Sequence, residues 1–212
     1  MITQEIWKEM LEPLLADVDS FSWVLPKDCP VSFSRDGTSL EQNLALRQEL
    51  NRTWNTDNRR RIELAVWYVR AWGGVRRTGD QTITRYVEGF PNLPNRMSGI
   101  SSWSKIATIS DPAKYAIYDA RVAFSLNAIQ KLSIGSIIES FPVPPGQNAT
   151  IEPAARSLGF ERVRTRTMRK PYERYLEIIH SADGWTMQKT EMALFATAIK
   201  LATKLRQASR SN

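Results

Sequence analysis

The sequence predicts a mainly α-helical fold, arranged as two lobes with a cleft between them, and three observations lead to that prediction. Apolar residues recur at spacings of three and four over several stretches, the pattern of helices with one buried face. Residues that favour helix starts and stops, such as Ser39 and Gly73, separate those stretches. The proline-rich residues 137–146 form a loop or lobe boundary. We expect one compact domain over residues 1–208 and a frayed tail over residues 209–212.

The beginning of the chain is predicted to hold two helices joined by extended chain. Residues 3–16 form the first helix, in which Pro13 is expected to produce a kink or a division. Residues 31–33 have the composition of a short strand or extended edge, which allows a small β element near the N-terminus. Ser39, followed three residues later by Gln42, resembles a capping box and is expected to start the second helix.

A third helix is expected over residues 58–72, and the glycines at 73 and 74 end it. The arginines at residues 59–61 crowd the start of this helix, where positive charge opposes the helix dipole. Two interpretations of them stay open: a solvated charge cluster, or a site that holds an anion. A segment over residues 81–87 and the turn-rich residues 90–94 then lead to the centre of the chain.

Residues 97–130 are the stretch with the most mechanistic content. Gly99 and its serine neighbours favour a tight bend, and residues 105–109 make a short apolar segment before a second bend. Residues 114–118 are aromatic and branched, which favours an extended connection. The apolar positions that follow recur at helical spacing, so Asp119 is predicted to lie at a helix N-cap. Capping alone would explain Asp119, and Lys105 alone would pass as a solvated lysine.

Taken together, these residues resemble the helix-hairpin-helix DNA glycosylase superfamily. The resemblance lies in the order Gly99-Ile100, then Lys105, a bend, an extended segment, and Asp119 at a helix start. Residues 102–105 and 116–122 most resemble a bacterial group described as having the 8-oxoguanine DNA glycosylase fold. The hairpin has one glycine where that family usually has two. The separation of 14 residues between Lys105 and Asp119 is about one helical turn shorter than usual.

The resemblance implies a DNA glycosylase with AP-lyase activity that needs no cofactor. Lys105 would attack C1′ of a flipped nucleotide and form a Schiff base, and Asp119 would assist it. The substrate implied is double-stranded DNA that contains an oxidised or otherwise modified base, with 8-oxoguanine as the first choice. Trp103 is expected to line the base pocket or to wedge into the gap that the base leaves. The DNA-contacting residues expected around the catalytic pair are Gly99, Ser101, Ser102, Trp103, Ser104 and Arg121.

The net charge of +7 is unevenly distributed along the chain. Residues 1–50 contain four Lys/Arg and nine Asp/Glu, a balance of −5, so residues 51–212 carry +12. Such asymmetry favours a polyanionic partner for the later part of the chain, and DNA is the first candidate. The basic stretch after residue 155 is interpreted as a phosphate-contacting segment, with a solvated loop as the alternative. The residues expected to contact phosphate there are Arg164, Arg166, Arg169 and Lys170.

Composition also excludes several classes of function. No apolar run is long enough to span a membrane, and no signal peptide is expected, so a cytoplasmic, nucleoid-associated protein is the default. A single cysteine, Cys29, rules out an internal disulfide framework and a thiolate metal cluster. His180 is the only histidine, so no metal site built on histidines is expected.

Two other functions stay open from the residues themselves. The chain could be a non-enzymatic helix-hairpin-helix DNA-binding module in which Lys105 contacts phosphate. It could also be a protein-interaction module that uses the acidic N-terminal residues. The first predicts a salt-dependent loss of affinity when Lys105 is replaced, and the second predicts no DNA affinity at low salt.

Overall fold

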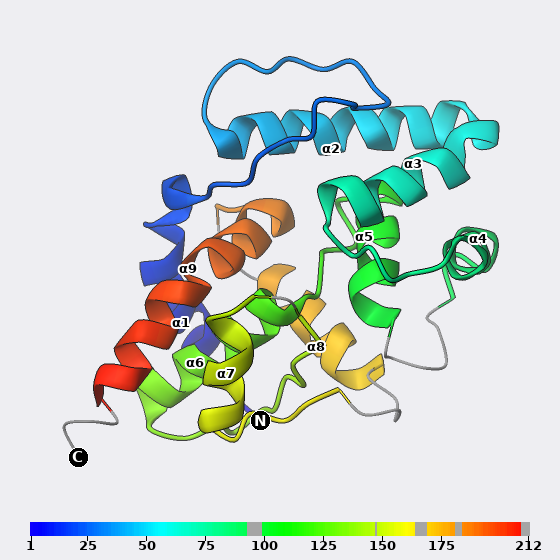
Figure 1. Ribbon diagram of the computed structural model, residues 1–212. Helices are drawn as coiled ribbons and strands as arrows, with labels where there is room; N and C mark the ends of the chain where they lie inside the picture. The colour runs from blue at the N-terminus through cyan, green and yellow to red at the C-terminus, as the bar shows by residue number, and fades with distance from the viewer. Residues whose placement is uncertain (93–98, 147, 164–168, 181–183, 209–212) are drawn as a thin grey trace.

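The computed structural model describes residues 1–92, 99–146, 148–163, 169–180 and 184–208 (Figure 1). Within these ranges the chain is mainly helical and contains no strand, so the predicted mainly α class is confirmed. One isolated parallel bridge joins Val143 to Arg162. The α-helices are α1 Gln4–Leu15, α2 Ser39–Thr56, α3 Arg61–Trp67, α4 Asp80–Glu88, α5 Ile100–Ser110, α6 Ala120–Ile134, α7 Ile151–Ser157, α8 Arg169–His180 and α9 Met187–Ala208. Short 3-10 turns lie at Val18–Ser20 and Asn58–Arg60, and a π-helix, η3, spans Tyr68–Trp72.

The segment between α1 and α2 corrects the expectation of a small N-terminal β element. Residues 21–38 form no strand and run as irregular chain alongside α2 (Figure 1). Hydrogen bonds from Trp23 hold this segment in place of strand pairing. Its backbone N–H donates to the hydroxyl of Ser39, and its indole Nε1 donates to the carbonyl of Trp72. The segment therefore contributes side chains to the helical core and no sheet.

The same hydrogen bonds explain why the predicted N-cap of α2, Ser39, is wrong by one residue. Thr38 is the N-cap, and it forms a capping box with Glu41. The hydroxyl of Ser39 is already engaged, because it accepts from Trp23 N–H and donates to the Trp23 carbonyl. A neighbouring threonine is a good cap, so it takes the role that was expected of Ser39.

The buried apolar residues form two hydrophobic clusters, and α5 contributes to both. The larger cluster draws on α1, α6, α7, α8 and α9, and the smaller draws on α2, α3, η3 and α4. From α5, Trp103 and Ala107 join the larger cluster, while Ile106 and Ile109 join the smaller. Every residue of α5 except Ser101 is consequently buried. A helix buried all round can hold a polar group away from water, and α5 holds Lys105.

The π-helix η3 continues α3 and brings two rings and a glycine to the centre of the molecule. Tyr68 and Trp72 stack with ring centroids 4.3 Å apart and an interplanar angle of 11°. Gly73 follows with φ −85°, and Gly74 has a left-handed φ of +66°, which is why a glycine is favoured there. Single π turns inside helices occur frequently at functional sites.

Candidate active site

Lys105 lies inside the protein, where the sequence alone could only suggest a surface lysine. Its relative exposure is 3%. Its Nζ donates to the carbonyl of Ser101, one turn earlier on α5, at 3.2 Å. Among the described residues, no carboxylate lies within ion-pair distance of this amine. Lys105 is therefore a buried amine whose only described hydrogen bond goes to a neutral carbonyl.

Asp119 caps α6, as the sequence predicted. Residues 115–119 have no regular secondary structure and lead from a turn after α5 to α6. The carboxylate Oδ1 of Asp119 accepts from Arg121 N–H at 2.9 Å and from Val122 N–H at 3.0 Å. No described residue donates a hydrogen bond to the other oxygen, Oδ2. The cap fixes the direction of the carboxylate and uses one of its two oxygens.

The two residues meet in one pocket at the centre of the molecule, of about 30 Å³. This volume suits a water molecule or two. The pocket draws on both hydrophobic clusters, which is why residues distant in the sequence meet in it. Its lining consists of Phe21, Trp23, Arg47, Trp72, Gly73, Lys105, Ile117, Asp119, Glu191 and Phe195.

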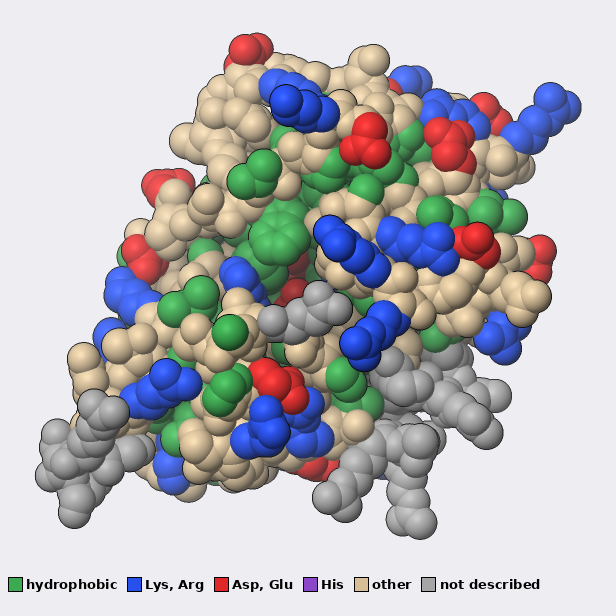
Figure 2. All heavy atoms as spheres, in the orientation of Figure 1, with side chains coloured by type: hydrophobic (Ala, Val, Ile, Leu, Met, Phe, Trp, Pro, Cys, Tyr) green, Lys and Arg blue, Asp and Glu red, His purple; other side chains and the backbone are tan. Residues whose placement is uncertain are grey.

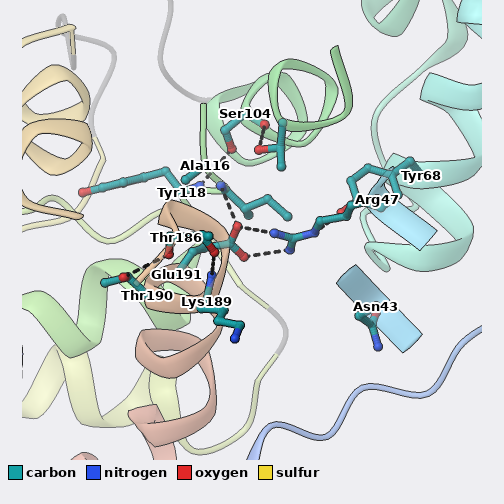
Figure 3. Close-up of polar contacts among 12 residues, drawn as sticks. Asn43, Arg47, Tyr68, Ser104, Ala116, Tyr118, Thr186, Lys189, Thr190 and Glu191 are labelled. Atoms are coloured by element: carbon teal, nitrogen blue, oxygen red, sulfur yellow. Dashed lines mark hydrogen bonds and ion pairs between the residues drawn. The ribbon is translucent and has the colours of Figure 1, made fainter. Parts of the chain in front are cut away.

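A buried ion pair between Arg47 of α2 and Glu191 of α9 forms one wall of the pocket (Figure 3). The guanidinium is bidentate: Nη1 lies 2.6 Å from Oε2 of Glu191, and Nη2 lies 2.8 Å from Oε1. Its Nε also donates to the hydroxyl of Tyr68 at 2.8 Å. Glu191 in turn accepts from the backbone N–H of Ile117 at 3.2 Å, in the segment that carries Asp119. The pair therefore ties α2, α9 and that segment together.

Burial lowers the pKa of Lys105 below its ordinary value of 10.5. Desolvation is the largest cause, since a charged ammonium is disfavoured away from water. The negative charges of Asp119 and Glu191 act in the opposite direction, and the positive charge of Arg47 adds to the lowering. The net lowering makes the neutral amine, which is the nucleophilic form, accessible at a lower pH than in a free lysine.

Aromatic rings line the side of the pocket next to Asp119. Trp23 packs edge-on against Phe195 at 5.3 Å and tilts against Trp72 at 6.0 Å. The guanidinium of Arg121 lies 4.3 Å from the ring centroid of Phe195 and 5.9 Å from that of Trp23. A hydrogen bond orients the indole of Trp72, because its Nε1 donates to Asn43 Oδ1 at 2.8 Å. The rings that line the pocket are thus held by specific contacts.

The structure corrects the expectation that the side chains of Ser102, Trp103 and Ser104 contact DNA, because all three are buried. Trp103 is 1% exposed, and its indole donates to the carbonyl of Asn92. The Ser104 hydroxyl accepts from the backbone N–H of Tyr118 at 3.0 Å (Figure 3), and the Ser102 hydroxyl bonds to that of Thr78. Trp103 is a core residue that packs against Phe90, Tyr115 and Tyr172.

The other predicted contact residues around α5 and α6 lie closer to the pocket. The carbonyl of Ser101 receives the hydrogen bond from Lys105. Gly99 caps α5, and a side chain at this position would collide with the hydroxyl of Tyr86, so internal packing already accounts for the glycine. Arg121 is half-buried, and burial lowers its pKa although Asp119 raises it. It lies against the aromatic side of the pocket.

Part of the predicted basic segment lies outside the described residues, namely Arg164 and Arg166. Arg169 is the first residue of α8, and Lys170 beside it is exposed. Two other arginines of this region are already paired, since Arg162 contacts Glu152 and Arg174 contacts Glu139. Figure 2 shows Lys and Arg side chains on both sides of a hollow near the centre of one face.

Sequence reasoning missed Arg47, Glu191, Trp23 and Phe195. Only Arg47 could have been identified from the sequence. It follows Leu46 among the buried residues of α2, and an arginine that is buried needs a partner for its charge. Its partner Glu191 is 144 residues away, so no local pattern identifies it.

The described residues contain neither a candidate metal site nor a candidate membrane-spanning helix. No group of three or more His, Cys, Asp or Glu side chains could hold a metal ion there. None of the helices in those ranges has the length and apolar character that crossing a membrane requires. Comparison with known proteins gives no match to a family model, to a curated protein or to a solved structure.

Proposed function

We propose that this protein is a DNA glycosylase with AP-lyase activity, in which Lys105 attacks the sugar of a modified nucleotide and Asp119 assists. The observation that carries the proposal is the pairing of a buried lysine of lowered pKa with a carboxylate in one pocket. A neutral amine and a nearby carboxylate are the two groups that Schiff-base chemistry at C1′ requires. The order of these residues in the sequence resembles the helix-hairpin-helix glycosylases, which supports the same reaction.

The reaction begins with the neutral amine of Lys105. Its lone pair attacks C1′, and the bond from C1′ to the base breaks, leaving its electron pair on the base, which takes up a proton. The lysine nitrogen then loses a proton, and Asp119 Oδ2 is the acceptor within the pocket. Opening of the sugar ring gives a protonated imine between Lys105 and C1′. Loss of a C2′ proton eliminates the 3′ phosphate, and water finally hydrolyses the imine and restores the lysine.

A base must leave the duplex to reach this amine, as in other enzymes that act on bases. The pocket of about 30 Å³ has no room for a purine, so the mechanism includes movement of its wall when DNA binds. Trp23 and Phe195 are the rings placed to move and then to stack on the extruded base. We take 8-oxoguanine as the first candidate from the resemblance, and duplex DNA as the partner. The +12 balance of residues 51–212 supports a polyanion.

The architecture belongs to the same proposal. Helix-hairpin-helix glycosylases have two helical lobes with the active site between them, and two hydrophobic clusters that share α5 support such an arrangement here. The pocket draws residues from both clusters. We therefore place the cleft for DNA at the junction of the two clusters.

The rival in which Lys105 is a phosphate contact of a binding module is disfavoured by burial. A lysine that is 3% exposed and hydrogen-bonded to a helix carbonyl cannot reach a phosphate at the surface. Its pKa is also lowered, whereas a phosphate contact depends on the charged form. The described structure offers no specific observation in favour of a protein-interaction module.

Borohydride trapping tests the proposal directly. The protein is incubated with a duplex that contains 8-oxoguanine, and reduction of the imine gives a covalent adduct that is counted on a denaturing gel. We expect an adduct with the parent protein and none with Lys105→Gln. The matched control is Lys131→Gln, an exposed lysine on α6, which should trap as well as the parent. An undamaged duplex should give no adduct.

A panel of other modified bases and abasic duplexes separates substrate choice from mechanism. An adduct on an abasic site alone would keep the lysine chemistry and reject 8-oxoguanine. Base release without an adduct would reject the lysine nucleophile and leave a monofunctional enzyme. The absence of both, with duplex binding that Lys105→Gln does not change, would reject the glycosylase proposal.

A further inference from the structure

The backbone dihedral angles of Gly73 do not explain why a glycine stands at this position. Its φ of −85° and ψ of −6° are open to any residue, unlike the left-handed φ of +66° at Gly74. The absence of a side chain at position 73 is thus not required by the dihedral angles of the residue. The reason must lie in what surrounds the α-carbon.

The neighbour of that α-carbon is the side chain of Lys105. The Cβ of an alanine at position 73 would lie 2.5 Å from Cε and 2.7 Å from Cδ of Lys105, and 2.8 Å from the carbonyl oxygen of Val69. All three separations are shorter than non-bonded contacts allow. The last two methylene groups of the lysine thus occupy the space that a side chain at position 73 would fill. Their position directs Nζ to the carbonyl of Ser101.

We propose that Gly73 is a positioning residue for Lys105, because its bare α-carbon forms the channel in which the lysine chain lies and so sets where the amine meets the pocket. The inference rests on the proposed function for its catalytic meaning. Its structural content is independent of that function, since it concerns only the contact between positions 73 and 105. Gly73 touches no substrate in this account and acts through the lysine alone.

A side chain at position 73 has a predictable effect on the amine. The space open to a displaced lysine is the pocket, which Asp119 and Glu191 line. Approach to these carboxylates and to water raises the pKa of the amine, and Arg47 is the one described cation of the lining that opposes the rise. Displacement should therefore both misplace the nucleophile and keep it protonated to higher pH.

The first experiment compares Gly73→Ala with Gly79→Ala. Gly79 is a suitable control because its φ is −70° and a Cβ there would meet no atom within 4 Å. Cyanate, a small reagent that modifies neutral amines, is applied across a pH series, and mass spectrometry follows Lys105, with the exposed Lys131 as the internal standard. We expect the pH of half-maximal modification at Lys105 to rise in Gly73→Ala and to stay unchanged in Gly79→Ala. An unchanged profile in a folded Gly73→Ala protein overturns the proposal.

The second experiment is a double-mutant cycle in thermal unfolding, which involves no DNA. Gly73→Ala is made in the parent and in a Lys105→Ala background, where the lysine chain no longer fills the channel. We expect the loss in melting temperature to be clearly smaller in the Lys105→Ala background, with the Val69 contact accounting for what remains. Equal losses overturn the proposal. If Gly73→Ala alone does not fold, a folded double variant supports it and an unfolded one overturns it.

Trapping on DNA adds the functional readout. In Gly73→Ala the rate of adduct formation should fall roughly a hundredfold, the loss that a misplacement of about 1 Å can cause. Gly79→Ala should trap as the parent does. If the parent itself forms no adduct with any duplex, the proposed function fails, while the cyanate and unfolding results still decide the role of Gly73.

Discussion

Arg47 and Lys105 are two basic side chains buried in the wall of one pocket, with relative exposures of 1% and 3%. Their hydrogen-bond partners differ, and their pKa values are shifted in opposite directions. Arg47 has a bidentate carboxylate partner and the hydroxyl of Tyr68. Lys105 has a hydrogen bond to the Ser101 carbonyl. Desolvation acts to lower the pKa of the arginine, but Glu191 and Tyr68 together raise it by more, so that pKa is raised, whereas the pKa of the lysine is lowered.

The difference follows from what each side chain can do with its charge. A guanidinium does not lose its proton inside a protein, so a buried arginine needs partners, and the fold brings Glu191 from another helix to supply them. An amine can become neutral when it is buried, so Lys105 can lie inside the protein without an ion pair. Arg47 ties α2 to α9, whereas the lowered pKa of Lys105 suits the reaction proposed for it.

The largest effect is expected from breaking the Arg47 pair. Arg47→Met leaves Glu191 buried without its cation, which should lower the free energy of unfolding by about 3–5 kcal/mol. Urea unfolding measures the change. Arg52→Met on the same helix is the control, because Arg52 pairs with Glu49 at the surface and its loss should leave the midpoint close to the parent. Equal midpoints for the two variants would contradict a structural role for the pair.

Replacement of Lys105 by arginine and by methionine sharpens the comparison. Lys105→Arg keeps the charge where no partner has been provided, and we expect a loss of roughly 3 kcal/mol of stability. Lys105→Met keeps the length of the chain without the charge and should be at least as stable as the parent at neutral pH. Both should be inactive in trapping. If the arginine is tolerated as well as the methionine, the pocket can pair a cation at position 105, and the distinction from Arg47 fails.

The pH dependence of stability gives the next effect in size. Because the folded-state pKa of Lys105 is below 10.5, the unfolded chain binds more protons between the two values, and stability rises with pH across that window. The free energy of unfolding of Lys105→Met minus that of the parent should be greatest below the lowered pKa and fall to a constant value as the pH rises past 10.5. The fall is about 1.4 kcal/mol for each unit of lowering. A constant difference between pH 6 and pH 10.5 in urea unfolding would contradict a lowered pKa.

The smallest effect separates the two roles of Asp119. Asp119→Ala removes the N-cap of α6 and should cost about 1 kcal/mol of stability, whereas Asp119→Asn keeps a capping oxygen and should cost little. Both substitutions remove the carboxylate, so both should slow adduct formation. Chemical unfolding and borohydride trapping on the same preparations provide the comparison. Full trapping by Asp119→Asn would limit Asp119 to capping.

Local chemistry explains which parts of this structure could be predicted from the sequence. The N-cap at Asp119 depends only on the residues that follow it, and that prediction is confirmed. The N-cap of α2 is Thr38 and not Ser39, because Trp23, 16 residues away in the sequence, occupies the serine hydroxyl. The residues of α2 themselves give no indication that Trp23 competes for this hydroxyl.

The site itself shows the same limit more strongly. Lys105 was chosen from its order in the sequence, but its burial depends on α5 lying between two hydrophobic clusters. Trp103 was expected at the DNA because aromatic residues can wedge into a duplex, and the packing of Tyr172 and Tyr115 around it makes it a core residue. The order of residues in the sequence singled out Lys105 as a candidate, and only tertiary packing shows its environment.

The small volume of the pocket limits which cellular compounds can reach Lys105. Because burial lowers the pKa of Lys105, its amine is neutral more often at a given pH than the amine of a free lysine, and on an open surface it would condense more readily with the reducing sugars and aldehydes of metabolism. A space of about 30 Å³ admits water and excludes a sugar. Trp23 and Phe195 line this narrow space and limit the access of such metabolites to Lys105. In the reaction proposed above, selectivity against free carbonyl compounds would then come from the shape of the pocket, before any base is recognised.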